Sequence, residues 1–61
     1  MRLRDRLAAQ VVLRKAFGVR GQTLKEGALR ELQKRPTSLR RFYAANLILE
    51  GRIREAAEWV R

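Results

Sequence analysis

The side chains that could do chemistry in this chain are mostly guanidinium groups. The 61 residues include fifteen Lys plus Arg against six Asp plus Glu, a formal net charge of +9, and twelve of the fifteen cations are arginine. A guanidinium can form two parallel hydrogen bonds with a phosphate and can stack on flat rings, whereas the ammonium of lysine acts as a point charge. The whole excess of cations lies before Phe42. This composition favours a polyanionic partner, above all a nucleic acid.

Catalysis has few residues to draw on. The sequence contains no histidine and no cysteine, so it offers no imidazole base, no thiol nucleophile and none of the usual zinc ligands. Ser38 is the only serine, and its position suits a helix cap. No pair of carboxylates lies in an apolar setting, and no nucleotide-binding motif occurs. We therefore expect a protein that is not an enzyme and that uses no metal or cofactor.

Helices must position the cations. Apolar residues recur at helical spacing, without strand-like alternation, in four segments: 2–17, 24–35, 38–50 and 52–61. Glycine or proline separates each segment from the next. The sequence predicts an all-α fold, a small bundle of three to four short helices, in a single basic domain that spans residues 1–61.

The second of these segments has the sharpest local signals. Thr23 and Glu26 have the spacing of a capping box, in which the two side chains satisfy free groups at the start of a helix. Pro36 is expected to stop the helix. Gly27, inside the segment, costs about 1 kcal/mol of helix propensity relative to alanine. We interpret it as the mark of a close crossing with another helix.

The most apolar stretch is residues 42–49, in which only Asn46 is strongly polar. On a helix its apolar groups would lie nearly all the way round, which is typical of a helix in the middle of a domain. We therefore expect helix 38–50 to be the buried centre of the fold. Arg40 and Arg41 would stand at its entrance.

The helix expected over residues 2–17 is apolar on more than one face. Leu3, Leu7 and Val11 form one row at a spacing of four, and Val12 lies in a second row beside it. A core of three further short helices would not cover both rows. We therefore expect either a homodimer or a protein partner to contact Leu3, Leu7, Val11 and Val12.

The pattern Ala44-x-x-Leu47-x-x-x-Gly51-x-Ile53-x-x-Ala56 resembles one helical hairpin of the tetratricopeptide family. In that family, small and large residues at this spacing let two antiparallel helices approach closely. The match covers about a third of the chain and a single unit, whereas arrays of this family need about three stacked units. The resemblance implies that the last two helices form an antiparallel hairpin, without implying peptide binding.

Residues 24–50 are also similar to a helix-turn-helix, with a short turn at Pro36. In that family, exposed residues early in the second helix contact base edges, and an arginine there can bind guanine through two hydrogen bonds. The resemblance implies that Ser38, Arg40 and Arg41 would carry this role. The turn lacks the glycine that the motif favours.

Three functions fit these features. The first is a small RNA-binding protein, a structural or accessory component of the ribosome or another ribonucleoprotein, which neutralises phosphates and fits RNA by shape. The alternatives are a helix-turn-helix DNA-binding regulator or chromatin-type protein, and a helical subunit for protein–protein interaction or assembly. The expected nucleic-acid contacts are Arg2, Arg4, Arg6, Arg14, Lys15, Arg20, Lys34, Arg35, Arg40 and Arg41. Trp59 is a candidate for base stacking, with a lid over the edge of the core as the commoner role for such a ring.

Cellular location has weaker signals. No apolar run approaches the roughly 20 residues that span a bilayer, and the basic start has no small-residue cleavage site. We therefore expect no membrane span and a cytoplasmic location. The preference for arginine, with little Asn, Cys or Met, fits a thermophilic source as well as a GC-rich genome.

Overall fold

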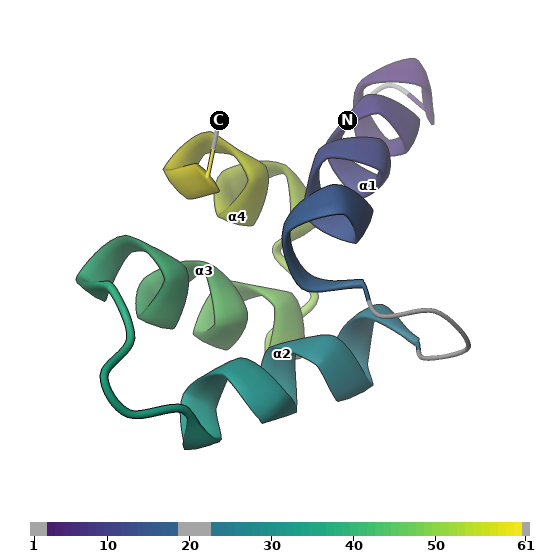
Figure 1. Cartoon of the computed structure of the whole chain (residues 1–61). Helices are drawn as coiled ribbons and strands as arrows, with labels where there is room; N and C mark the ends of the chain where they lie inside the picture. The colour runs from purple at the N-terminus through teal and green to yellow at the C-terminus, as the bar shows by residue number, and fades with distance from the viewer. Residues whose placement is uncertain (1–2, 19–22, 61) are drawn as a thin grey trace.

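A computed structural model describes residues 3–18 and 23–60 of the chain (Figure 1). The described residues form helices and connections, without a strand, which confirms the predicted all-α fold. The helices are α1 (Leu3–Phe17), α2 (Leu24–Gln33), α3 (Leu39–Leu49) and α4 (Ile53–Val60). Each lies inside the range expected from the sequence, and α2 ends two residues before the expected Arg35.

Two of the helices start at side-chain caps. The hydroxyl of Thr23 accepts a 3.2 Å hydrogen bond from the Glu26 N–H and donates a 3.0 Å hydrogen bond to the Glu26 carboxylate. The threonine half of the predicted capping box therefore forms, and the Glu26 carboxylate accepts from the Thr23 hydroxyl. Ser38 Oγ accepts a 3.1 Å hydrogen bond from the Arg41 N–H, as an N-cap does. Ser38 thus begins α3, as expected.

The turn between α3 and α4 depends on Gly51, whose φ of +80° strains any other residue. The Gly51 N–H donates to the Ile48 carbonyl at 3.0 Å, and the Arg52 N–H donates to the Leu47 carbonyl at 2.9 Å. These are the two hydrogen bonds of a Schellman motif. Because the chain reverses within this turn, α4 returns antiparallel along α3 (Figure 1), which confirms the predicted hairpin.

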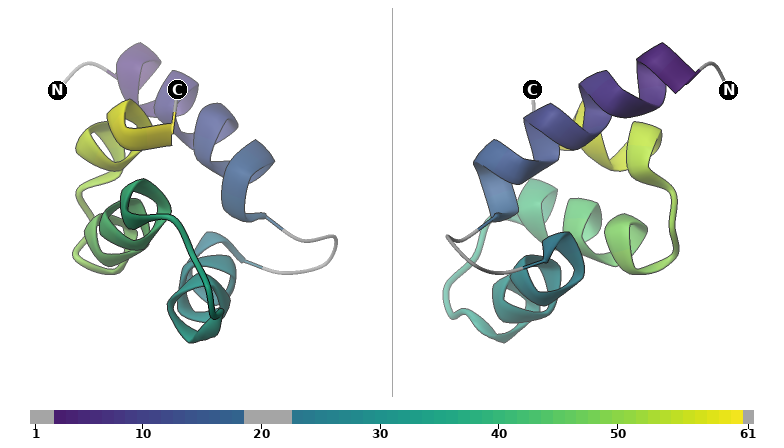
Figure 2. Two further views of the ribbon diagram at one scale, coloured as in Figure 1. Left: turned by 60° about the vertical axis from the view of Figure 1, so that its left-hand side comes forward. Right: turned by 90° about the vertical axis from the view of Figure 1, so that its right-hand side faces the viewer.

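The helices α2, α3 and α4 follow one another side by side, and α1 packs mainly on α4 (Figures 1 and 2). In Figure 1 α2 and α3 run alongside each other in opposite directions, joined by the short connection that contains Pro36. The order of helix, short turn and helix expected for residues 24–50 is therefore present.

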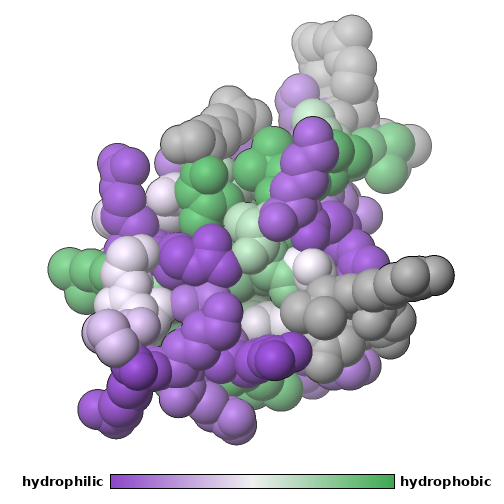
Figure 3. All heavy atoms as spheres, in the orientation of Figure 1, coloured by the Kyte–Doolittle hydropathy of each residue, from purple (hydrophilic) through white to green (hydrophobic). Residues whose placement is uncertain are grey.

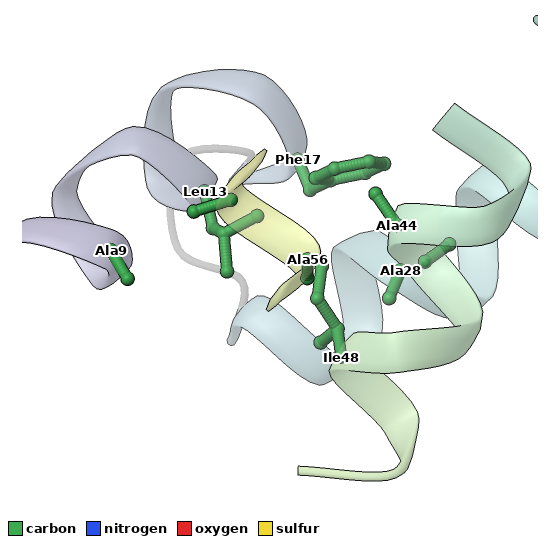
Figure 4. Packing of buried hydrophobic residues seen from close by; sticks show 9 residues of the cluster. Ala9, Leu13, Phe17, Ala28, Ala44, Ile48 and Ala56 are labelled. Atoms are coloured by element: carbon green, nitrogen blue, oxygen red, sulfur yellow. The ribbon is translucent and has the colours of Figure 1, made fainter. Parts of the chain in front are cut away.

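Small side chains make up most of the core. Among the described residues, six of the nine buried hydrophobic side chains are alanines, which let the helix backbones approach closely (Figure 4). The large members are Leu13 and Phe17 of α1 and Ile48 of α3. A core of so few large side chains buries little apolar area, and stability is correspondingly modest.

Gly27 lies where the end of α1 meets the start of α2. A Cβ atom on Gly27 would stand 1.8 Å from the carbonyl oxygen of Phe17, which is too close for any other residue. The contact is with backbone, so a rotamer change cannot relieve it. The predicted close helix crossing is therefore confirmed.

The prediction that α3 is buried all round is wrong. Its inner side is in the core, where Ala44 is fully buried and Ile48 is 6% exposed. Its outer side is open, with 68% of Leu39, 39% of Phe42 and 47% of Tyr43 exposed. Among the described residues, α2 and α4 flank α3 and leave this outer side uncovered.

Candidate nucleic-acid interface

Three exposed aromatic side chains form a row across α3 and α4. The rings of Phe42 and Tyr43 meet edge to face, with centroids 6.4 Å apart and planes at 75°. The rings of Tyr43 and Trp59 are 5.4 Å apart and tilted by 35°. Trp59 is 41% exposed, so this ring contacts Tyr43 and still faces solvent. We call Phe42, Tyr43 and Trp59 the aromatic row.

Two different features of the sequence position this row. Phe42 and Tyr43 are neighbours near the start of α3, on the side that no described helix covers. Trp59 is near the end of α4, and the reversal at Gly51 carries it back to the start of α3. Of these three residues, the sequence analysis selected only Trp59.

A groove of about 670 Å³ adjoins the row at Phe42. Its apolar walls are Leu32 from α2 and Leu39 with Phe42 from α3. The connection between the two helices forms the rest, and the charged residues of the lining, Lys34 and Arg35, are both cations. The outer side of α3 thus presents exposed aromatic rings next to an apolar groove with a basic border.

Two arginines beside these features are available for an external partner. Arg35 and Arg40 are exposed, and neither forms a hydrogen bond or ion pair with the part of the chain that the structure describes. Arg40 precedes Tyr43 by three residues, a spacing that makes them neighbours on a helix surface. Lys34 is less available, because its Nζ forms an ion pair with the Glu31 carboxylate at 3.5 Å.

Arg41, also predicted to contact nucleic acid, is turned into the fold. Its Nη2 donates a 2.8 Å hydrogen bond to Glu31 Oε1 and a 2.7 Å hydrogen bond to the carbonyl of Ala16. Its guanidinium carbon lies 4.6 Å above the centre of the Phe17 ring. The Ala16 carbonyl is in the last turn of α1, where carbonyls have no partner within the helix. Arg41 therefore ties α3 to α1 and α2.

Glu31 is the buried partner in this cluster, with 3% of its side chain exposed. Its other carboxylate oxygen accepts a hydrogen bond from the Thr37 hydroxyl. The hydrogen bond from Arg41 lowers the pKa of Glu31 to about 2, helped by Thr37 and Lys34 and opposed by burial. Glu31 is not among the residues that the sequence predicts to have a special role. Glu31 follows Gly27 by four residues and Ala28 by three, so the three residues share one face of α2, and this face is buried. The spacing is the sequence signal that would have placed Glu31 on the buried face.

The remaining predicted cations are spread over another part of the molecule. Arg6, Arg14 and Lys15 are exposed on α1, which lies away from the α2–α3 connection in Figures 1 and 2. Arg2, Arg20 and the side chain of Arg4 lie outside the described residues. The structure thus brings Lys34, Arg35 and Arg40 together with the aromatic row, and it leaves the α1 cations apart.

Carboxylates gather at the opposite end of the α3–α4 hairpin. Arg52 Nη1 lies 3.2 Å from Glu50, and Arg52 Nε donates a 3.1 Å hydrogen bond to Glu55. Hydrogen bonding to Arg52 lowers the pKa of Glu55. Glu50 precedes α4 and Glu55 lies in its first turn, whereas Trp59 is near its end, so the length of α4 separates these two carboxylates from the aromatic row.

Within residues 3–18 and 23–60, no group of acidic side chains is arranged to hold a metal ion. None of the described helices combines the length and apolar character needed to cross a membrane. The chain matches no protein-family model, no curated protein and no solved structure, so its function has to be inferred from its own residues.

Proposed function

We propose that this protein binds RNA, as a small structural or accessory component of a ribonucleoprotein such as the ribosome, and that it holds unpaired nucleotides on the aromatic row. The observation that carries the proposal is the juxtaposition of exposed, mutually supporting rings with uncommitted guanidinium groups. Tyr43 and Trp59 supply the rings, and Arg35 and Arg40 supply the charge. Stacking of a base on an aromatic side chain contributes about 1–3 kcal/mol and tolerates any sequence.

Charge favours a nucleic acid over a protein on this surface. An aromatic patch alone suits a protein interface as well as a stacked base. Here the charged residues that line the adjoining groove are Lys34 and Arg35, and the whole molecule carries +9. Each phosphate that binds a guanidinium releases counterions, and this release drives much of the binding to polyanions.

The exposed aromatic faces favour unpaired RNA over duplex DNA. A base inside a double helix has both faces covered by its neighbours, so it cannot stack on Tyr43 or Trp59. Loops, bulges and ends of folded RNA offer unstacked bases, and these are what most RNA-binding modules contact. The DNA-binding alternative relied on a helix-turn-helix in which Arg41 would contact base edges, whereas the Arg41 guanidinium is hydrogen-bonded to Glu31 and to the Ala16 carbonyl.

We infer the following mechanism. Bases stack on the exposed parts of Tyr43 and Trp59, and the groove beside Phe42 accommodates an adjacent base against Leu39. Arg35 and Arg40 bind the phosphates on either side of α3. The cations of α1 add long-range attraction without direct contact to these nucleotides.

Trp59 makes the proposal directly testable, because it is the only tryptophan in the chain. Its fluorescence should be quenched by an RNA hairpin with an unpaired loop and unchanged by a fully paired RNA of equal length and charge. Tyr43→Ser should weaken binding of the hairpin about tenfold, which corresponds to roughly 1.4 kcal/mol of lost stacking. Arg54→Gln, which removes an exposed arginine of α4 outside the proposed contact set, is the matched charge control.

Two results would oppose the proposal. Equal quenching and equal affinity for the paired and unpaired RNAs would mean that the row does not stack on bases. Equal losses for Arg54→Gln and Arg40→Gln would mean that the protein attracts polyanions by net charge alone. A clear preference for one duplex DNA sequence would return the DNA-binding alternative.

A further inference from the structure

We propose that the outward side of α1 is a docking site for an acidic amphipathic helix of a partner protein. The helix has two apolar sides. Ala9 and Leu13 are at most 1% exposed and belong to the core, whereas Leu7 is 53% exposed and Val11 is 56% exposed. Residues two positions apart on an α-helix point about 200° from each other, so Val11 points away from both Ala9 and Leu13.

The exposed side is a shallow groove rather than isolated side chains. It encloses about 500 Å³ and is lined by Leu7, Gln10, Val11, Arg14 and Lys15. Leu7 and Val11 are one helical turn apart and form an apolar stripe along α1. Figure 3 shows hydrophobic surface emerging along α1 between hydrophilic side chains. An apolar stripe of this kind matches the anchor spacing of helix-in-groove recognition.

Charge selects the occupant. Within the part of the chain that the structure describes, the ionisable residues in the lining are Arg14 and Lys15, both cations. Asp5 is the only acidic residue of α1, and its position two residues before Leu7 points it to the other side of the helix. A partner helix with an apolar stripe bordered by Asp or Glu would match both the stripe and its basic border.

The same charges disfavour the other occupants. A symmetric homodimer through α1, which the sequence left open, would place the same surface on both sides of the interface. It would bring two copies of the same basic border, Arg14 and Lys15, together across the interface. RNA would gain little here, because Leu7 and Val11 offer no ring on which a base can stack. The site is also separate from the aromatic row, so the inference stands whether or not the protein binds RNA.

The test is selection from a displayed library of helical peptides in which both apolar and charged positions are randomised, with the full chain as target. We expect the selected peptides to carry Asp or Glu beside apolar residues spaced by three and four. Val11→Ser should weaken a selected peptide at least tenfold, and Lys15→Gln should weaken it severalfold. Leu29→Ser, which alters a 44% exposed leucine of α2, is the matched control and should leave binding unchanged.

The competing occupants give different results. Selected peptides without acidic residues, or acidic peptides that bind the Val11→Ser and Leu29→Ser variants equally, would overturn the proposal. So would a dimer in analytical ultracentrifugation that Val11→Ser dissociates, or tight binding to vesicles of phosphatidylserine in place of peptide. Circular dichroism of each variant establishes that it is folded. An RNA hairpin added at saturation should leave peptide binding intact, which separates this site from the aromatic row.

Discussion

Arg41 of α3 donates a 2.8 Å hydrogen bond to Glu31 of α2, whose side chain is only 3% exposed. The same guanidinium holds a carbonyl at the end of α1 and covers the ring of Phe17. An arginine that the sequence assigns to phosphate contact therefore organises the interior. Neighbouring Arg40 is exposed and uncommitted within the described residues, so two consecutive arginines have different roles.

This difference predicts that Arg41→Met destabilises the fold and Arg40→Met does not. Loss of Arg41 removes the guanidinium that is hydrogen-bonded to the buried Glu31 carboxylate and leaves it with the more distant, exposed ammonium of Lys34, at a cost of about 3 kcal/mol. The free energy of unfolding from urea titration measures the effect, and Arg40→Met should change it by less than about 0.5 kcal/mol. Glu31→Gln combined with Arg41→Met should recover part of the loss. Equal stability of the two single variants would contradict the role assigned to Arg41.

The same cluster predicts a loss of stability in acid. The pKa of Glu31 is about 2 in the folded chain and 4.5 as the unperturbed value. A lowered folded pKa means that the stabilisation is fully present above pH 4.5 and disappears as the pH falls toward 2. The difference corresponds to at most about 3 kcal/mol. Thermal unfolding between pH 7 and pH 2 measures it. The Glu31→Gln variant should be less stable than the unmodified protein at pH 7, and its stability should depend less on pH. If the two proteins lose stability in parallel as the pH falls, Glu31 is not the cause of the acid sensitivity.

The close crossing predicts that Gly27→Ala destabilises the protein although alanine is the better helix former. The added Cβ would meet the Phe17 carbonyl at 1.8 Å, so α1 and α2 must separate. Overpacking of this kind costs about 1–3 kcal/mol, more than the roughly 1 kcal/mol gained in helix propensity. Gln33→Ala, at an exposed position of the same helix, should be neutral or stabilising. Chemical denaturation gives the free energy of unfolding of both variants. A Gly27→Ala variant more stable than the unmodified protein would show that α1 and α2 are not in close contact at Gly27.

Salt dependence should separate the stacking residues from the phosphate contacts. If Arg35 and Arg40 each bind one phosphate of single-stranded RNA, replacing either by Gln should reduce the slope of log K against log salt by about 0.7. Tyr43→Ser should lower affinity at every salt concentration and leave the slope unchanged, because stacking releases no counterions. Filter binding between 50 and 300 mM salt measures both quantities. A changed slope for Tyr43→Ser would place a phosphate on the tyrosine instead.

The sequence by itself determined the local structure of this protein. The capping box at Thr23, the cap at Ser38 and the reversal at Gly51 all rest on hydrogen bonds between residues three to five positions apart. Such contacts depend on neighbours in the chain, so a local pattern is enough to predict them. The sequence predicted three to four helices from the same kind of local pattern, and it predicted the final hairpin from the resemblance of the stretch from Ala44 to Ala56 to a tetratricopeptide unit.

Only the tertiary structure decided which faces meet. Phe42 and Tyr43 belong to the most apolar stretch, yet they are exposed because the described helices flank α3 without covering its outer side. Trp59 joins their row because α4 returns to the start of α3. Arg41 turns inward because α1 and α2 present a carbonyl and a buried carboxylate at its position. These contacts join residues far apart in the chain, and the spacing of residues along a single helix carries no information about them.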